Sequence, residues 1–364
     1  MLANNDAWVY KLRKETILAL LKHGYSVYIS SPRGEFSPIM EQWGCVWIES
    51  KLERRGKNLA SDLKLFTHYI GLIKNIKPNV VLSYTIKPNL YGGLASRLLN
   101  TPYICNITGL GSGFSGNSIL KKLIIQLYKH SLKKANCVFF QNNEDQKILQ
   151  EHGIVKNNYQ VIPGSGVNLD EYQYKSYPPM DSKITFTFIG RIMKDKGIDE
   201  FLEAAKAIKQ KYENTSFTVI GFIEPTQVQY SEKIKQYSED GYIEYVGFQK
   251  NVIPYIEQSH CIIQPSHGGE GMSNVLLETA AIGRPLIASD IPGCRETIVE
   301  GENGYLFFPK DTKSLVSKIE IFLSLPYTEK IILGINSRSK VEREFDRRIV
   351  TKEYLKKINN IFDN

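Results

Sequence analysis

Two glutamates with a fixed spacing are the feature of the sequence that most clearly suggests chemistry. Glu270 lies in the glycine-rich segment HGGEGM, and Glu278 follows after seven residues, inside the apolar run NVLLETAAI. If the second segment is helical, the step between them spans about 12 Å, because a helix rises about 1.5 Å per residue. That length is of the order of the distance from a sugar ring, across a diphosphate, to a ribose. One carboxylate can then accept hydrogen bonds from sugar hydroxyls while the other binds a ribose diol.

Two cations upstream suit the diphosphate between those ends. Arg191 and Lys196 lie in FIGRIMKDKGIDE, where a strand is expected to end at Gly190 and a helix to begin near Gly197. Open parallel sheets bind ligands outside the carboxyl ends of their strands. Arginine forks onto phosphate oxygens and lysine supplies a point charge. Taken alone, either residue is equally well explained as a solvated loop cation.

The start of the expected helix supplies backbone donors as well. Met272 or Ser273 is expected near its N-cap, so free N–H groups and the helix dipole favour an anion there. Glu270 alone is explained as an ordinary acid at a helix N-terminus, and Glu278 alone as a surface glutamate. However, an unpartnered carboxylate is costly in the apolar surroundings of Glu278. The two glutamates and the two cations together favour a nucleotide-sugar site.

Strand and helix signals alternate along the whole chain, which predicts doubly wound parallel sheets. The alternation is interrupted by the polar, proline-bearing segment 172–183, which we interpret as the linker, and it restarts after this segment. We therefore expect an α/β fold of two tandem Rossmann-like domains, 1–176 and 182–340, and a last helix within 341–364 that returns to the first domain. The expected strands are 25–30, 45–50, 79–85, 102–108, 137–142, 184–190, 217–221, 243–247, 261–266 and 284–290. Only MLA precedes the first expected helix, so either the first strand is a stub or the sequence begins inside a longer product.

Composition places the chain among soluble globular proteins. It has 364 residues, 42% apolar and 23% charged, no apolar run of membrane-spanning length and no signal-peptide pattern. The five cysteines are scattered without metal-site spacing, as expected of reduced thiols in the cytoplasm. Residues 1–180 carry 22 lysines and arginines against 12 acids, a net charge of +10, whereas the whole chain carries +8. A basic half indicates an anionic partner or simply a basic solvated surface.

The basic excess suggests a membrane-facing surface. The expected helix 118–134, SILKKLIIQLYKHSLKK, combines an apolar set with five lysines, and the segment 51–57 reads KLERRGK. Such a helix can lie on anionic headgroups, although a packed helix with a solvated lysine face explains the same pattern. Nearby, the Gly- and Ser-rich loop NITGLGSGFSGN lets the backbone approach a ligand closely.

The chain resembles retaining nucleotide-sugar glycosyltransferases of family four, which have the two-domain GT-B architecture. The resemblance rests on EGMSNVLLE with GRPLIASDIPGCRETIVEGENGYLF, and on the E-x7-E pattern with G-R-x4-K-G before it. The segments SYTIKPNLYGGLASRLL, ITGLGSGF and PGSGVNLDEY extend it over most of the chain, toward bacterial enzymes of capsule, O-antigen or lipid-linked oligosaccharide synthesis. Transferases that add N-acetylgalactosamine to lipid-linked bacillosamine are similar in these segments.

The resemblance implies a role for each matching residue. Glu278 would bind the donor ribose, Glu270 would stabilise charge at the anomeric carbon, and Arg191 with Lys196 would hold the diphosphate. The implied donor is a nucleotide sugar, expected to be UDP-linked, with no metal and no separate cofactor; the implied acceptor is linked to a polyprenyl diphosphate. Further donor contacts are expected from Gly190, Val246, Gly247, Gly271, Met272, Ser273 and Asn274. Acceptor or sugar contacts are expected from Thr85, Lys87, Thr108, Gly109 and Gly111.

Departures from the family pattern leave alternatives open. Thr108 stands where relatives carry a histidine in the loop near the transferred sugar, and SYTIKPN offers Thr85 and Lys87 instead of a histidine, so no general base is assigned. The segment NND replaces a Gly-Gly pair near the start. A non-hydrolysing nucleotide-sugar epimerase and a non-catalytic nucleotide-sugar-binding protein remain alternatives. Nucleic-acid binding explains the charge but not the carboxylates, and no G-x-G-x-x-G follows a strand as a dehydrogenase requires.

Overall fold

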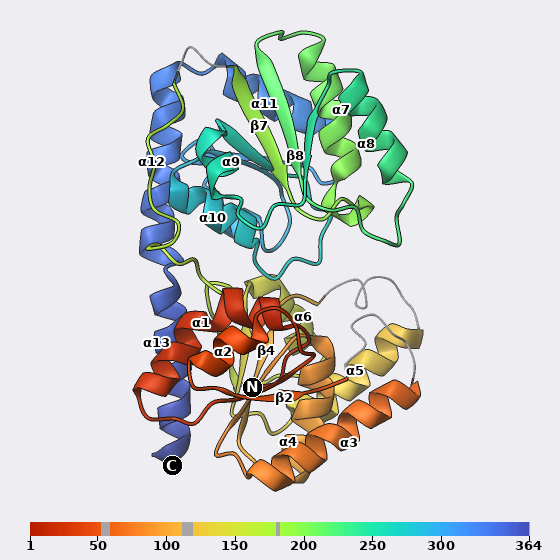
Figure 1. Cartoon of the computed structure of the whole chain (residues 1–364), viewed down its shortest axis with the longest axis vertical. Coiled ribbons are helices and arrows are strands. Elements are labelled where there is room, and N and C mark those ends of the chain that lie inside the picture. The colour runs from red at the N-terminus through yellow and green to blue at the C-terminus, as the bar shows by residue number, and fades with distance from the viewer. Residues whose placement is uncertain (52–58, 111–118, 180–182, 364) are drawn as a thin grey trace. The chain divides into compact units, whose positions relative to one another are not determined.

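The chain folds into two compact units. The computed structural model describes residues 1–51, 59–110, 119–179 and 183–363. Contacts divide the chain into a first unit, Met1–Gly166 with Arg347–Asn364, and a second unit, Val167–Asp346. In Figure 1 the second unit is coloured from yellow-green to blue, and the first from red to yellow with its last helix in dark blue. The segment expected as a linker, as far as it is described, lies in the second unit.

A parallel sheet forms the centre of the second unit. Its strand order is β12-β11-β10-β7-β8-β9, and every described pairing is parallel. The strands are β7 (Ile184–Ile189), β8 (Thr215–Ile220), β9 (Glu244–Gly247), β10 (Cys261–Gln264), β11 (Leu286–Ser289) and β12 (Gly304–Phe307). Because side chains alternate along a strand, Phe186 and Phe188 enter one core layer while Ile189 enters the opposite one. This is the doubly wound topology expected from the sequence.

Helices cover both faces of this sheet. One face is packed by α7 (Ile198–Lys209), α8 (Tyr230–Glu239) and α11 (Thr312–Ser324). The opposite face is packed by α9 (Ile253–Gln258) and α10 (Asn274–Ile282), with α12 (Tyr327–Glu344) against α10. Figure 1 shows α7 and α8 on one side of β7 and β8, and α9 and α10 on the other. Two short 3-10 turns, η3 (Lys194–Lys196) and η4 (Arg295–Thr297), complete the unit's described helices.

Arg284 fixes the end of α10 and the entry into the second unit. α10 ends at Gly283, which has the left-handed φ of 86° typical of a helix C-terminus. The guanidinium of Arg284 is fully buried, and among the described residues its acceptors are backbone carbonyl oxygens. Its acceptors are the carbonyls of Lys175, Ser176, Ile256, Glu257, Ile282 and Gly283. A buried cation is tolerated here because these dipoles replace its hydration.

The first unit contains two groups of parallel strands that the chain start joins. The groups are β1-β2 and β3-β4-β5-β6. Their strands are β1 (Tyr28–Ser31), β2 (Val46–Glu49), β3 (Val81–Tyr84), β4 (Tyr103–Ile107), β5 (Cys137–Phe140) and β6 (Tyr159–Val161). Leu2 forms parallel bridges to Ser30 and Ser83, so the first residues act as the stub strand between β1 and β3. The Met1 amine donates to the Tyr28 carbonyl at 2.6 Å, and burial lowers its pKa to about 5.

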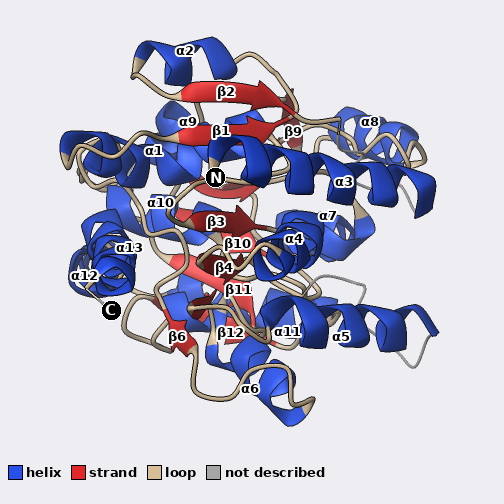
Figure 2. Ribbon diagram, turned by 90° about the horizontal axis from the view of Figure 1, so that it is seen from below, coloured by secondary structure: helices blue, strands red, loops and turns tan. Residues whose placement is uncertain are grey.

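Helices also form two layers on the first unit's strands. One layer holds α1 (Asp6–Lys22), α2 (Ser37–Gln42) and α13 (Arg347–Phe362). The other holds α3 (Leu59–Ile76), the π-turn η1 (Pro88–Gly92), α4 (Gly93–Leu98), α5 (Ile119–Leu132) and α6 (Asn143–Glu151). Figure 2 shows α3, α4 and α5 on one side of β3 and β4, with α1 and α13 on the opposite side.

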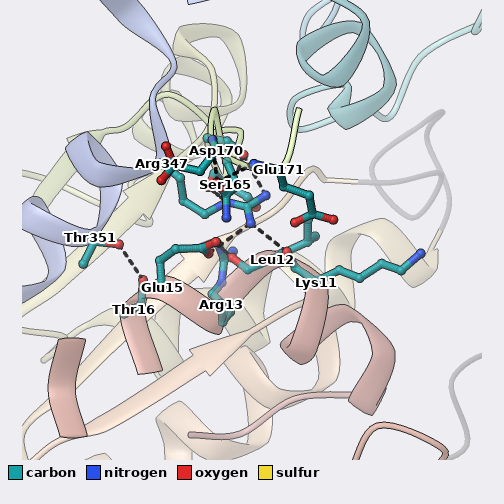
Figure 3. A network of polar contacts seen from close by, with 12 residues as sticks. Lys11, Leu12, Arg13, Glu15, Thr16, Ser165, Asp170, Glu171, Arg347 and Thr351 are labelled. Carbon is teal, nitrogen blue, oxygen red and sulfur yellow. Dashed lines mark hydrogen bonds and ion pairs between the residues drawn. The ribbon is translucent and has the colours of Figure 1, made fainter. Parts of the chain in front are cut away.

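Arg347 attaches the last helix to the first unit (Figure 3). It is the first residue of α13, and its guanidinium is buried. Its Nη1 donates to the Lys11 carbonyl at 2.8 Å and to the Glu15 carboxylate at 3.0 Å, both on α1. Its Nε donates to the Ser165 carbonyl at 3.2 Å. One side chain thus joins α13, α1 and the segment that precedes the first crossing between the units.

Candidate active site

The strand order of the second unit creates a switch point between β7 and β10. From β7 the sheet continues to β8 and β9, and from β10 it continues the other way to β11 and β12. Loops at the carboxyl ends of two such strands diverge and leave room for a ligand. The loop after β7 carries Gly190, Arg191 and Lys196, and the loop after β10 carries Glu270. The structure therefore brings the two sequence segments together at the position where this topology binds ligands.

Glu270 is held by contacts from both loops. Its carboxylate forms an ion pair with the Lys196 ammonium. The Ser266 hydroxyl donates to the same carboxylate at 3.0 Å, and the Gln264 amide donates to that hydroxyl at 2.8 Å. The Lys196 and Glu270 side chains are 22% and 17% exposed, so the pair is largely shielded from water yet still reachable. A charge held this way keeps its position when a ligand arrives.

Two glycines permit the close approach of these loops. A Cβ on Gly197 would lie 1.8 Å from the Pro265 carbonyl oxygen, and a Cβ on Gly293 would lie 2.8 Å from the Glu270 backbone oxygen and Cβ. Both residues also have left-handed φ values, of 73° and 84°. A side chain at Gly197 would separate the segments that carry Lys196 and Glu270, and a side chain at Gly293 would push the loop after β11 away from Glu270.

The loop after β7 is attached to the loop after β8. The Arg191 guanidinium donates to the Glu224 carboxylate at 2.9 Å, and Ile192 bridges Ile223. Glu224 is buried, 7% exposed. Sequence reasoning missed Glu224, although its place just after the strand FTVI was a signal that it lies at the same sheet edge. In this structure Arg191 and Lys196 are each paired with a carboxylate.

A histidine–glutamate contact supports the glycine-rich loop from α7. His267 Nε2 lies 3.0 Å from Glu200 Oε2, and the two side chains are 9% and 11% exposed. The backbone N–H of His267 donates to the Asp195 carbonyl at 3.0 Å. These contacts join the loop that holds Glu270 to the segment that holds Lys196. Neither His267 nor Glu200 was identified from the sequence.

The helix expected between the two glutamates is present as α10. Ser273 is its N-cap, and its hydroxyl accepts from the Leu276 N–H at 3.4 Å. The Ser273 N–H donates to the Gly293 carbonyl at 2.7 Å, which fixes the start of the helix beside Glu270. Glu278 lies on the second turn of α10 and is half-buried. Gly271, Met272 and Asn274 lie at the helix start, as the sequence predicts.

The remaining donor residues of the prediction lie at the same sheet edge on another strand. Val246 and Gly247 end β9, which is separated from β7 by β8 alone. Gly247 has a φ of 79°, and its carbonyl accepts from the Gly221 N–H at 2.9 Å. Because all these strands are parallel, their carboxyl ends face the same way. The backbone at Val246–Gly247 is therefore on the edge that carries Arg191.

The residues expected to contact the acceptor lie in the first unit. Thr85 and Lys87 follow β3, and Thr108 and Gly109 follow β4, at adjacent carboxyl ends. Lys87 forms an ion pair with Asp62 at 2.7 Å. Gly111, also expected here, lies outside the described residues, as do residues 52–57 of the basic segment 51–57.

Metal ligands, membrane-spanning helices and disulfides supply no further site in the described part of the chain. In the described part of the chain, no cluster of three or more histidine, cysteine, aspartate or glutamate side chains could hold a metal ion. No described helix combines the length and the apolar character needed to cross a membrane. All five cysteines are free and buried.

Two doubly wound units are the GT-B architecture that the sequence resemblance implies, and the second unit carries paired cations and carboxylates at its switch point. Family models agree: glycosyl transferases group 1 matches residues 171–339, and glycosyl transferase 4-like matches residues 1–142. The chain is therefore a glycosyltransferase, with a glycosyl transferase 4-like domain followed by a glycosyl transferases group 1 domain.

Several relatives are similar along most of their length. One is the N,N'-diacetylbacillosaminyl-diphospho-undecaprenol alpha-1,3-N-acetylgalactosaminyltransferase of Campylobacter jejuni, 26% identical over 100% of this chain and 98% of the relative. The UDP-Gal:alpha-D-GlcNAc-diphosphoundecaprenol alpha-1,3-galactosyltransferase of Escherichia coli is 24% identical over 79% and 80%. The capsular polysaccharide biosynthesis glycosyltransferase CapM of Staphylococcus aureus is 26% identical over 85% and 83%.

Solved structures share the fold. Anabaena HepE in complex with UDP has a TM-score of 0.80 and 15% identity, covering 99% of this chain and 98% of that one. A glycosyltransferase from Rickettsia africae has a TM-score of 0.82 and 20% identity, covering 100% and 97%. At these identities the likeness concerns the fold.

Proposed function

We propose that this glycosyltransferase moves a hexose or N-acetylhexosamine from a UDP-sugar to a glycan linked to a polyprenyl diphosphate, with retention of anomeric configuration. The observation that carries the proposal is the Lys196–Glu270 pair at the switch point, with Arg191 in the same loop as Lys196. The relatives from Campylobacter and Escherichia, whose names specify diphospho-undecaprenol acceptors, support the acceptor class. Capsule or O-antigen synthesis is the corresponding process.

The proposed chemistry assigns one task to each charged group. Arg191 and Lys196 bind the donor diphosphate and stabilise the negative charge that develops on it as the bond to the anomeric carbon breaks. Glu270 stabilises the positive charge that develops on the sugar. The acceptor oxygen attacks the anomeric carbon from the side that the phosphate leaves, and the departing phosphate takes the acceptor proton. The bond lost and the bond formed are then on one face, so the configuration is retained.

The nucleotide end uses α10 and β9. Glu278 accepts hydrogen bonds from the ribose diol, and the N–H groups at the start of α10 face the phosphates. The backbone at Val246–Gly247 contacts the base. These assignments follow from a site that extends from the switch point along the sheet edge to β9.

A ligand screen and a coupled assay test the proposal. Thermal shifts with UDP, GDP and several sugar nucleotides identify the donor, because a specific ligand stabilises the folded state by mass action. We expect UDP to raise the melting temperature. Turnover is then measured with donor plus lipid-linked acceptor and with donor alone. Conversion of the donor sugar without an acceptor would identify an epimerase, and a UDP shift without turnover would identify a binding protein.

We further propose that the first unit meets the anionic inner face of the plasma membrane through α5. Lys122 and Lys133, within and just after this helix, are exposed, and Lys121 and Lys129 are partly exposed. Leu123 of α5 is 48% exposed, and Leu98 of the neighbouring α4 is 64% exposed. Lysines beside exposed leucines suit an interface of headgroups and acyl chains, at about 1 kcal/mol per lysine near the surface.

Vesicle co-sedimentation tests the membrane surface. With phosphatidylglycerol vesicles, binding should fall by about 100-fold or more when the four lysines of α5 and its end become glutamate. A charge-matched control places the same change on exposed lysines of the second unit. The control changes Lys183, Lys235, Lys250 and Lys313 to Glu. Equal loss in both variants, or no loss in the α5 variant, would reject this surface.

A further inference from the structure

Two side chains of the first unit, Lys87 and Tyr91, converge on the carboxylate of Asp62 near the carboxyl end of β3. The Lys87 ammonium lies 2.7 Å from Asp62 Oδ1, and the Tyr91 hydroxyl donates to Asp62 Oδ2 at 3.0 Å. Asp62 is on the first turns of α3, Lys87 follows β3, and Tyr91 is in η1. The Lys87 and Asp62 side chains are 17% and 16% exposed. Sequence reasoning identified Lys87 but neither Asp62 nor Tyr91.

The backbone that presents Lys87 is strained. Thr85, directly after β3, has a φ of 70°, in the left-handed region that β-branched residues avoid. Such a conformation costs about 1–3 kcal/mol and persists at sites where the surroundings enforce it. The Thr85 Oγ1 atom is buried and has no hydrogen-bond partner among the described residues. A strained residue with an orphan hydroxyl at a strand's carboxyl end points to a ligand-binding edge.

Hydrogen bonds through Asn89 hold the turn after Thr85 in place. The Asn89 N–H donates to the Thr85 carbonyl at 3.0 Å, which begins η1. The Ser83 hydroxyl donates to the Asn89 side chain at 2.8 Å, and the Asn89 amide donates to the Asn106 carbonyl at 2.8 Å. Lys87 therefore extends from a fixed backbone, as a residue that must hold a ligand requires.

Stability alone does not account for the cluster. Two largely buried charges lose hydration, and their attraction roughly repays that cost, so apolar residues of similar size would serve the fold as well. Burial and the nearby Asp62 raise the pKa of Tyr91, so its hydroxyl remains a donor to the carboxylate. The cluster instead keeps one lysine positioned at the carboxyl end of a parallel strand, where ligands of such sheets bind.

We propose that the Lys87 ammonium binds the diphosphate of the lipid-linked acceptor, and that Asp62 and Tyr91 are positioning residues that hold this ammonium in place. The inference rests on the proposed function and adds a residue-level account of the acceptor's anionic group. When the acceptor is absent, Asp62 neutralises Lys87; when it binds, the ammonium is shared between the carboxylate and the diphosphate. Recognition of the diphosphate then depends on Lys87 and is independent of the donor site.

Steady-state kinetics with two acceptors test the proposal. One acceptor carries its glycan on a polyprenyl diphosphate, and the other carries the same glycan on an uncharged alkyl glycoside. Lys87→Met should raise KM for the diphosphate acceptor about tenfold or more, with KM for the donor unchanged. For the uncharged acceptor, the variant and the wild type should be alike. Equal effects on both acceptors, or a changed donor KM, would overturn the assignment of Lys87.

The positioning residues have their own variants and control. Asp62→Asn and Tyr91→Phe should raise the KM for the diphosphate acceptor about threefold to tenfold. Asp62→Glu keeps the carboxylate, so its KM for this acceptor should stay close to that of the wild type. The control Lys156→Met removes an exposed lysine of the same unit and should change nothing. An Asp62→Asn variant with an unaltered acceptor KM would remove Asp62 from this role.

A binding measurement separates this inference from the proposed function. Geranyl diphosphate serves as a sugar-free probe, and its thermal shift is measured with saturating UDP so that the donor cations are occupied. We expect a shift in the wild type and in Lys156→Met, and none in Lys87→Met. A wild type without any UDP shift would contradict the proposed function. A geranyl diphosphate shift that is absent from the wild type, or intact in Lys87→Met, would contradict the inference.

Discussion

The Lys196 ammonium and the Glu270 carboxylate form an ion pair across the switch point of the second unit's sheet. Arg191, in the same loop as Lys196, is paired with Glu224 at 2.9 Å. Both cations proposed to bind the donor diphosphate are therefore neutralised by carboxylates in this structure. A bound diphosphate brings negative charge to the same cations, so it must share them with Glu270 and Glu224. In the proposed site, the two carboxylates therefore hold the Arg191 and Lys196 side chains in fixed orientations before the donor binds.

Replacing Glu270 by glutamine should separate catalysis from donor binding. The variant keeps the shape of the side chain but loses the charge proposed to stabilise the transition state, so kcat should fall about 100-fold or more. UDP should bind at least as tightly, because Lys196 loses a competing carboxylate. Calorimetric UDP titration and initial-rate kinetics measure the two effects. The control Ser266→Ala removes one donor to the same carboxylate and should cost less than tenfold; an unchanged kcat in Glu270→Gln would rule out the assigned role.

Local sequence signals predicted most of the elements of this site. The glycine-rich turns, the apolar strands and Ser273 as a helix N-cap all depend on nearby residues, and the structure places α10 at Asn274–Ile282, as expected. The alternation of strands and helices also predicts which loops share a sheet edge. The position of Lys196 and Glu270 on one edge was therefore predictable although 74 positions separate them.

The partners of these residues were not predictable from the sequence. Glu224, Glu200 and Asp62 each pair with a residue on another element, and a single sequence contains no signal for which acid meets which cation. The left-handed backbone conformation of Thr85 was also not predictable from the sequence, because threonine disfavours this conformation and no local pattern indicates it. Such exceptions to local preference depend on the surrounding tertiary structure.

Glu278 can be tested through the ribose it is proposed to bind. In the wild type, UDP should stabilise the protein more than 2′-deoxy-UDP does, because the carboxylate loses one hydrogen-bond donor. In Glu278→Ala the two nucleotides should give the same small shift. Thermal shift at matched ligand concentrations measures both. The control Glu302→Ala, at an exposed glutamate of the same unit, should behave like the wild type; a preserved preference for UDP in Glu278→Ala would place the ribose elsewhere.

The left-handed backbone conformation of Thr85 should lower the stability of the folded protein, so a residue that tolerates this conformation should raise it. Asparagine tolerates the left-handed region better than threonine, so Thr85→Asn should stabilise the first unit by about 1 kcal/mol, or about 2–4 °C in melting temperature. Differential scanning calorimetry measures the change, and Thr101→Asn, at another partly buried threonine of the same unit, is the control. A lower melting temperature for Thr85→Asn would show that the native backbone at this position favours threonine.

His260 should make the second unit sensitive to mild acid. The side chain is 1% exposed, and its Nδ1 accepts from the Thr185 N–H at 3.1 Å, so the ring is held neutral. Burial lowers the pKa of His260 to about 4, and the charges of Arg284 and Lys330 act in the same direction. Below pH 6.5 the unfolded chain takes up a proton at this position that the folded chain does not. Stability from this residue is therefore present above pH 6.5 and is lost as the pH falls toward 4.

The predicted loss is about 2 kcal/mol at pH 5, given that each pKa unit corresponds to about 1.4 kcal/mol. His260→Asn is the matched variant, because its amide oxygen can accept from the Thr185 N–H and does not titrate. The melting temperature of the wild type should fall more steeply between pH 7 and pH 5 than that of the variant, by several degrees. His68 of the first unit, whose pKa burial also lowers, remains in both proteins, so its contribution cancels in the comparison. Parallel melting curves for the two proteins across this range would mean that His260 takes up its proton equally in the folded and unfolded states.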